Sequence, residues 1–167
     1  LKTSPAFEAA LFSGLRMAGP IDAYRELIPQ FCRQVGVGFQ ILNDLKDWRG
    51  DRLNKVVVGQ DALALRPTVL LALALDKATP EQRRRIRSLY ESDAPDAERL
   101  ADLQDLFEST GAFDRAEQLV EKSRARSEAL ADEVQPEALR QLLYFCIDTV
   151  LAEEGEPTAA EHLDPPL

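Results

Sequence analysis

Several residue types and patterns are scarce in this chain of 167 residues, and each scarcity narrows the choice of structure. Its two cysteines, Cys32 and Cys146, lie far apart in apolar helical patterns, which suits reduced core thiols better than a disulfide framework. The longest strongly apolar run, residues 69–75, is far shorter than the roughly 18 residues that suggest a membrane span. Alternating apolar and polar positions, typical of strands, are nearly absent. We therefore expect a soluble, all-helical protein without a membrane span, with the cytoplasm as its default location.

Composition and charge are those of an ordinary globular domain, with 45% hydrophobic and 29% charged residues. The length suits a single domain with one core. Lysine and arginine number 20 against 29 aspartates and glutamates, a formal net charge of −9 that would repel nucleic acid and anionic membranes. We therefore expect no nucleic-acid partner, and a phosphate-bearing ligand would need local cations and metal ions to hold it.

Hydrophobic positions recur every three or four residues almost throughout, and this period predicts helices. Ser4-Pro5 is a favoured helix start, and Gly19-Pro20 is a stop. Pro29 should kink or split the second helical stretch, because proline lacks the backbone donor that a helix interior needs. Residues 49–61 read as an ordered loop. The predicted helices cover residues 4–17, 21–48, 66–78, 80–91, 96–109, 113–134 and 136–153, and together they predict a domain over residues 1–153 with a flexible acidic and proline-rich tail over 154–167.

Four polar side chains share one face of the second predicted helix. At about 100° per residue, Gln40, Asn43, Asp44 and Asp47 fall within an arc of roughly 100°, opposite an apolar stripe. Carboxylate and amide oxygens without cysteine or histidine suit a hard ion such as Mg²⁺, which commonly bridges protein to phosphate. By itself, the pentapeptide Asn-Asp-Leu-Lys-Asp is more often an ordinary solvated helix end than a metal site. The surrounding sequence must therefore decide between these two interpretations.

That context resembles the trans-isoprenyl diphosphate synthases, the polyprenyl synthetase family. The resemblance covers residues 2 to about 75 and rests on motifs in the family's order: Lys2-Thr3, then the second aspartate-rich motif with its preceding Phe-Gln at residues 38–47, then Gly50-Asp51, Lys55, Gly59-Gln60-Asp61 and Arg66-Pro67-Thr68. Beyond this, only the run of helices matches. The resemblance implies an all-α helical bundle of the isoprenoid (terpenoid) synthase type, of which this chain is the C-terminal portion.

The family performs Mg²⁺-dependent condensation of isopentenyl diphosphate with an allylic diphosphate, and this is the activity that the resemblance implies. By the same resemblance, the diphosphate contacts would be Lys2, Thr3, Gln40, Lys55 and Arg66, the first three also being catalytic. The metal would be held, directly or through water, by Asn43, Asp44, Asp47 and Asp61. These roles suit the chemistry, because ionising an allylic diphosphate requires positive charge on the leaving oxygens.

The chain departs from the family pattern at several points. Asn43 stands where the family usually has an aspartate that binds metal, so we expect weakened metal binding. Arg66 replaces the usual lysine and keeps its charge. Lys55 lies slightly farther upstream of Gly59 than the family pattern places its lysine. The family's first aspartate-rich motif is absent. Because the sequence also starts at Leu1 without methionine, we expect a longer protein or a separate N-terminal half as partner, and no activity from these residues alone. A homodimer is expected as well.

Two other functions are compatible with the same residues. A class I terpene cyclase is one, because Asn43, Asp47 and Asp51 follow at four-residue steps that resemble that family's metal triad. Asp47 occupies the place of an expected serine or threonine, however, and Lys2-Thr3 with Arg66-Pro67-Thr68 favours the synthase. The other is a non-catalytic regulatory subunit, which Asn43 favours. The arginine run at residues 83–87 is interpreted as a solvated helix face.

Overall fold

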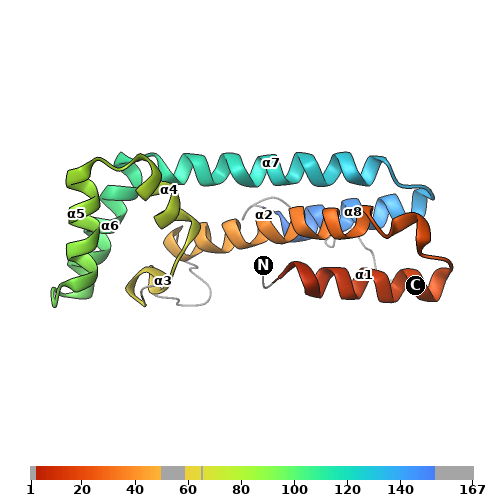
Figure 1. The fold of residues 1–167 in the computed structure, drawn as a ribbon, viewed down its shortest axis with the longest axis horizontal. Coiled ribbons are helices and arrows are strands. Elements are labelled where there is room, and N and C mark those ends of the chain that lie inside the picture. Colours follow the sequence, from red (N-terminus) through yellow and green to blue (C-terminus); the bar gives the residue numbers. More distant parts are fainter. Residues whose placement is uncertain (1–2, 50–58, 65, 153–167) are drawn as a thin grey trace, which may run out of the picture. The chain divides into compact units, whose positions relative to one another are not determined.

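The computed structural model describes residues 3–49, 59–64 and 66–152, and every regular element within these ranges is a helix (Figure 1). The all-α prediction is therefore confirmed. In chain order the elements are α1 (Ser4–Ala18), the 3-10 helix η1 (Asp22–Tyr24), α2 (Leu27–Arg49), α3 (Gln60–Leu63), α4 (Val69–Lys77), α5 (Pro80–Glu91), α6 (Asp96–Ser109), α7 (Ala112–Asp132) and α8 (Glu137–Val150). No helix in these ranges is long and apolar enough to cross a membrane.

Local signals account for several of the helix boundaries. Thr79 caps α5 with a capping box. The Thr79 hydroxyl accepts a hydrogen bond from the backbone N–H of Gln82 at 3.2 Å, and the side-chain Oε1 of Gln82 accepts one from the backbone N–H of Thr79 at 2.9 Å. Pro29 was expected to kink or split a helix, but α2 begins only two residues before it. Pro29 therefore lies in the first turn, where the missing N–H removes no helical hydrogen bond. The break in the predicted helix falls upstream, between η1 and α2.

The chain divides into two compact units, residues 1–40 with 120–167 and residues 41–119. In the first unit, α2 buries Ile28, Phe31, Cys32 and Val35, and α8 buries Leu143 and Ile147. Both cysteines are free, which fits the expected thiols, and burial raises the pKa of Cys32 to about 12. The predicted tail, residues 154–167, lies outside the described residues, so the domain boundary remains a prediction.

The second unit has a core of its own that supports the C-terminal end of α2. Its buried residues come from α3, α5 and α6 and are Ala62, Ile86, Leu89, Leu103 and Leu106. The Trp48 ring packs edge-on against Phe107 at 5.1 Å and against Phe113 at 6.2 Å between ring centroids. Such aromatic pairs add to the hydrophobic burial and fix ring orientation. They anchor α2 one residue after Asp47, the last residue of the aspartate-rich motif.

Candidate functional site

The C-terminal turns of α2 carry the aspartate-rich motif on a helix whose other side is held in the core. Ile41, Leu42 and Leu45 are 5% exposed or less, whereas Asn43 is exposed and Asp47 is half-buried. The hydrophobic residues fix the rotation of the helix, because turning it would bring them into water. The sequence pattern thus places Asn43 and Asp47 where a ligand could reach them.

Asp44 is the most deeply buried carboxylate of the motif, at 5% exposure. Its Oδ2 accepts a hydrogen bond from the backbone N–H of Val69, the first residue of α4, at 2.7 Å. The Thr68 hydroxyl caps the same helix end by accepting from the Leu71 amide at 3.2 Å. The first N–H groups of a helix lack intrahelical partners and carry partial positive charge, so a carboxylate there is stabilised. Asp44 consequently ties the motif to the start of α4.

Asp47 makes the equivalent connection to the short helix α3. Its Oδ2 accepts from the Asp61 amide at 3.2 Å, and its backbone carbonyl accepts from the Gly59 amide at 2.9 Å. Gly59 has a φ of 72°, and a Cβ there would lie 2.3 Å from Leu100 Cδ2. Glycine is favoured at this turn for its backbone conformation, whereas the Leu100 side chain could shift to make room for a Cβ. This turn brings the backbone N–H of Asp61 within hydrogen-bond distance of the Asp47 carboxylate.

Burial raises the pKa of the Asp47 carboxyl, and the nearby negative charges of Asp61 and Asp44 raise it further. Hydrogen bonds from the backbone N–H groups of Asp61 and Gln60 act in the opposite direction. The net result is a carboxylate whose charge is costly in this structure. A cation placed among these carboxylates would relieve that cost.

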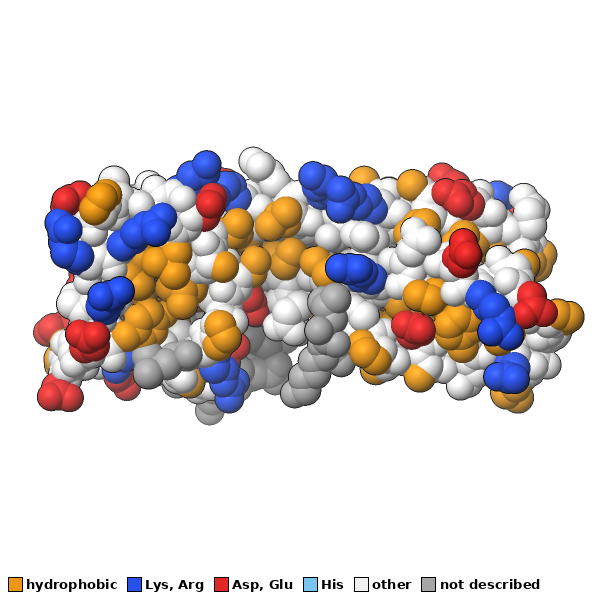
Figure 2. All heavy atoms as spheres, in the orientation of Figure 1, with side chains coloured by type: hydrophobic (Ala, Val, Ile, Leu, Met, Phe, Trp, Pro, Cys, Tyr) orange, Lys and Arg blue, Asp and Glu red, His pale blue; other side chains and the backbone are white. Residues whose placement is uncertain are grey.

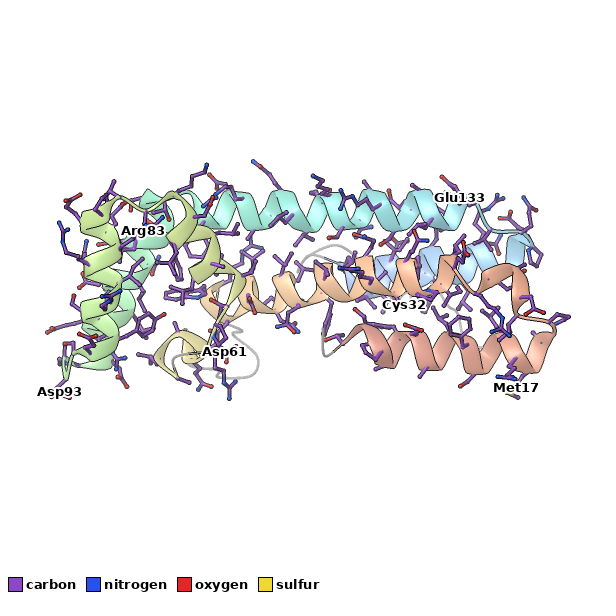
Figure 3. The ribbon with its side chains drawn as sticks, in the orientation of Figure 1. Met17, Cys32, Asp61, Arg83, Asp93 and Glu133 are labelled. Carbon is purple, nitrogen blue, oxygen red and sulfur yellow. The ribbon has the colours of Figure 1, made fainter. Side chains whose placement is uncertain are left out.

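Arg66 adds a positive charge at the edge of this group. Its Nη1 donates to Asp61 Oδ1 at 2.7 Å, and its backbone N–H donates to the Asp61 carbonyl at 2.9 Å. The Arg66 side chain is 69% exposed, so the guanidinium is accessible to a ligand. Asp61, labelled in Figure 3, also lines a cleft of about 530 Å³ together with Gln60, Leu63, Ala64, Arg66 and Asp96. This cleft has mixed polar and apolar walls and opens beside the motif.

The donor chemistry of the site fits Mg²⁺. Asp44, Asp47 and Asp61 offer carboxylate oxygens and Asn43 offers an amide oxygen, and such oxygens are the ligands of hard cations. In residues 3–49, 59–64 and 66–152, no three acidic, histidine or cysteine side chains are grouped so as to hold a metal ion by themselves.

The structure places the predicted site residues in three groups. Asp47, Asp61 and Arg66 are linked by hydrogen bonds, and Asp44, bonded to the Val69 amide, lies in the same unit with Asn43 exposed on the same helix. Thr3 and Gln40 belong to the other unit, Thr3 as the N-cap of α1 and Gln40 as an exposed residue of α2. Lys2 and Lys55 lie outside the described residues. That Lys2, Thr3 and Gln40 face the aspartates remains a prediction.

Asp96 is a cleft residue that the sequence did not reveal. It lies in the first turn of α6 and lines the cleft beside Asp61. An acidic residue at a helix start is common because it complements the helix dipole. Its sequence context therefore gave no sign of a place near the site, which depends on how α6 packs in the folded unit.

Sequence and structure comparisons agree on one family. The model of the family described as polyprenyl synthetase matches residues 1–107. The octaprenyl diphosphate synthase of Escherichia coli K12 is 30% identical over 152 residues, which are 87% of this chain and 46% of that protein. An all-trans-nonaprenyl-diphosphate synthase of Rhodobacter capsulatus is 29% identical over 155 residues, again 46% of its length. The chain thus spans about half the length of these relatives.

Solved structures show the same fold. A geranylgeranyl pyrophosphate synthetase from Pyrococcus horikoshii superposes with a TM-score of 0.78 at 22% identity, covering 92% of this chain and 46% of that one. A geranylgeranyl pyrophosphate synthase from Corynebacterium glutamicum, complexed with isoprenyl diphosphate and magnesium, superposes with a TM-score of 0.65 at 26% identity, covering 76% and 37%. The expected isoprenoid synthase fold is therefore confirmed, and the chain belongs to the polyprenyl synthetase family.

Proposed function

We propose that this chain is part of a trans-prenyltransferase that condenses isopentenyl diphosphate with an allylic diphosphate. The observation that carries the proposal is the linked set Asp47, Asp61 and Arg66, in which two carboxylates and one exposed guanidinium lie together and two of the three residues line a cleft. Carboxylates that share a site with an arginine suit a diphosphate held together with a divalent cation. Family membership supports the same substrate class.

The acidic residues of the site would bind the metal ion, and the basic ones would bind the diphosphate. Asp47 and Asp61, with Asn43 and Asp44 beside them, would hold Mg²⁺ directly or through water. When bound, Mg²⁺ supplies positive charge that stabilises the departing diphosphate. The structure of the Corynebacterium relative with isoprenyl diphosphate and magnesium supports this cofactor. The raised pKa of Asp47 supports it as well, because a cation would favour the ionised carboxyl.

Arg66 would bind the diphosphate together with Lys2, Thr3, Gln40 and Lys55. Its ion pair with Asp61 is exposed, and such a pair contributes little to stability, so the guanidinium can turn toward a phosphate at small cost. The planar guanidinium offers paired N–H donors to phosphate oxygens. In the reaction, the allylic carbon–oxygen bond breaks and diphosphate leaves with the electron pair. The alkene of isopentenyl diphosphate then forms the new carbon–carbon bond, and a proton is lost.

The complete enzyme would include a second polypeptide segment. This chain carries a single aspartate-rich motif and spans about half the length of its relatives, so we propose that the remaining half of the fold supplies the other metal ligands. We also propose that the assembled protein is a cytoplasmic homodimer. By itself, the 167-residue chain should bind Mg²⁺ and diphosphate without condensing substrates.

Calorimetry with inorganic diphosphate and MgCl₂ tests the site directly on this chain. Arg66→Ala should weaken diphosphate binding about tenfold or more, because a charge-assisted hydrogen bond is worth roughly 1.5–3 kcal/mol. Arg84→Ala is the matched control. Arg84 is 71% exposed and pairs with Glu81 at 2.8 Å, as Arg66 is 69% exposed and pairs with Asp61 at 2.7 Å. Undetectable Mg²⁺-dependent binding by the unaltered chain, or equal losses in both variants, would overturn the proposal.

A regulatory subunit without catalysis is the second candidate, favoured by a neutral Asn43 at a solvent-exposed position of the motif. Reconstitution with the remaining half of the fold separates the two. Turnover that requires isopentenyl diphosphate and is abolished by Asp47→Ala supports the enzyme. Turnover that is unchanged by Asp47→Ala supports the regulatory subunit.

A further inference from the structure

The arginine run at residues 83–87 contains two kinds of side chain. Its four arginines are all exposed on α5, as expected for a solvated helix face. Arg84 pairs with Glu81 at 2.8 Å, and Arg85 pairs with Asp102. Carboxylates of the same unit therefore balance these two positive charges, which are ordinary ion-paired surface residues.

Arg83 and Arg87 lie one helical turn apart on α5 and share a face of it. Within the described residues neither of them forms an ion pair, and Arg87 has no hydrogen-bond partner. Arg83 Nε donates to the Ala78 carbonyl at 3.2 Å, which fixes the base of its guanidinium. In a chain with a net charge of −9, two guanidiniums without carboxylate partners form a local positive site.

Both arginines line a groove between α4 and α5. Its volume is about 380 Å³, within the range of small-molecule sites. The lining residues are Leu71 and Leu75 of α4 with Arg83, Ile86, Arg87, Tyr90 and Glu91 of α5. On the face seen in Figure 2, hydrophobic side chains gather between α4 and α5 with basic side chains at their border, and Figure 3 labels Arg83 there. The groove thus combines an apolar surface with positive charge.

We propose that this groove binds an amphipathic phosphate, a molecule with a single apolar chain and a phosphate head group. The apolar chain would lie on Leu71, Leu75 and Tyr90, which pack on the core of this unit and are held in place by it. The head group would bind Arg83 and Arg87, because a guanidinium donates paired N–H groups to phosphate oxygens.

The charges of the lining decide the class of ligand. Two guanidiniums stand against one carboxylate, that of Glu91, so the groove favours an anion. A phosphate monoester carries nearly two negative charges at neutral pH and can pair with both arginines, whereas a carboxylate carries one. The groove shares no residue with the cleft lined by Asp61 and Arg66. It is therefore a second anion site, and the proposal does not depend on the proposed function.

Calorimetry with octyl phosphate in the absence of Mg²⁺ tests the groove on this chain. Octyl phosphate should bind at least tenfold more tightly than inorganic phosphate, which lacks the chain, and than octanol, which lacks the charge. Octanoate, with the same apolar character and a single charge, should also bind more weakly. Nuclear magnetic resonance should show shifts of the Tyr90 ring signals when octyl phosphate binds, since Tyr90 lines the groove.

Substitutions of charged residues on α5 provide the matched comparison. Arg87→Ala should weaken octyl phosphate binding about tenfold, through the loss of a charge-assisted contact. Glu91→Gln should strengthen it roughly two- to fivefold, because a like charge is removed. Arg84→Ala removes the same charge from the same helix outside the groove and should change the affinity less than about twofold. Circular dichroism of each variant confirms the helical fold.

Several results would overturn the proposal. Undetectable binding of octyl phosphate by the unaltered chain is one, and equal losses in Arg87→Ala and Arg84→Ala are another, because net charge alone would then attract the ligand. Inorganic phosphate or octanoate that binds as tightly as octyl phosphate would also contradict it. Loss of binding in Arg66→Ala would place the ligand in the other cleft. A failed Mg²⁺-dependent diphosphate titration would instead refute the proposed function and leave the groove unaffected.

Discussion

Asp44 of α2 accepts a 2.7 Å hydrogen bond from the backbone N–H of Val69, which connects the aspartate-rich motif to the first residue of α4. Asp44→Ala removes this acceptor and leaves the amide without its partner. We expect a loss of about 1–3 kcal/mol in the free energy of unfolding, the cost of an unpaired buried donor. Asp44→Asn keeps an oxygen that can accept and should cost less. Urea denaturation measures both.

The control for this prediction is Asp105→Ala, because Asp105 is an exposed aspartate of α6 in the same unit. Its removal should change the free energy of unfolding by no more than about 0.5 kcal/mol. Diphosphate titration then separates the two roles of Asp44, since Asp44→Asn should weaken Mg²⁺-dependent binding while preserving most of the stability. If Asp44→Ala were as stable as Asp105→Ala, the hydrogen bond between Asp44 and the Val69 amide would contribute nothing measurable to the free energy of unfolding.

The raised pKa of Asp47 predicts a pH-dependent stability with a definite sign. Below the ordinary value of 3.8 the carboxyl is protonated in both the folded and unfolded states, and its favourable contribution is complete. As the pH rises through the higher folded-state pKa, the group must ionise in a partly buried place and that contribution is lost. Asp47→Asn cannot ionise. It should therefore be more stable than the unaltered chain at neutral pH, and the difference should shrink toward pH 3.8.

Urea midpoints of the two proteins across this pH range test the prediction, with the diphosphate titration run in parallel. The asparagine variant should gain stability and lose Mg²⁺-dependent binding, because a functional carboxylate is held where its charge is costly. A variant that is less stable than the unaltered chain at every pH would mean that the hydrogen bonds from the Asp61 and Gln60 amides outweigh burial.

Local chemistry was enough to predict most of the helices. Thr79-Pro80 gives the start of α5, and the three- to four-residue period gives the course of α2 and its polar face. The predicted start of α2 was wrong. The chain between Gly19 and Leu27 contains the 3-10 helix η1, so α2 begins at Leu27 and Pro29 lies in its first turn. Helix α3 fell partly in a predicted loop, since four residues are too few to show a period.

The burial of the individual site residues could not be predicted from the sequence. Asn43, Asp44 and Asp47 share a helical face by spacing alone, but Asp44 is buried and Asn43 is exposed. The difference arises because α4 begins directly at Asp44, and its first amide lies 25 residues away in the sequence. Such a contact depends on tertiary packing, which cannot be predicted from the hydrophobic periodicity or from a local motif.

Asn43→Asp should strengthen metal binding. The substitution adds a negative charge with little change in volume next to Asp44 and Asp47, on an exposed position of α2. Because solvent screens an exposed charge, we expect the Mg²⁺ concentration for half-maximal diphosphate binding to fall by roughly three- to tenfold. Gln30→Glu is the matched control, since it adds the same charge at an exposed amide on the same helix, in the other unit. An equal response from both variants would show that net charge, and not coordination by residue 43, sets the Mg²⁺ dependence.

Gly36 of α2 should not tolerate alanine, because the first turn of α1 lies against it. A Cβ at residue 36 would lie 2.4 Å from Ser4 Oγ, 3.0 Å from the Ser4 amide nitrogen and 3.1 Å from Ser4 Cα. Since two of these atoms belong to the backbone, α1 would have to shift, and we expect Gly36→Ala to cost about 1–3 kcal/mol. Gly14→Ala meets open space on α1 and should instead gain about 0.5–1 kcal/mol from helix propensity.

The Ser4 hydroxyl provides a second measurement of the same contact. Ser4 is 7% exposed, and its Oγ has no hydrogen-bond partner in the described part of the chain, so Ser4→Ala alone should cost little. In the Gly36→Ala background, Ser4→Ala removes the atom at 2.4 Å but leaves the two backbone contacts. The double variant should therefore recover part of the lost stability, giving a favourable coupling energy in a double-mutant cycle. Strictly additive effects would mean that alanine at residue 36 destabilises the chain without touching Ser4, and that α1 does not rest on α2 at this point.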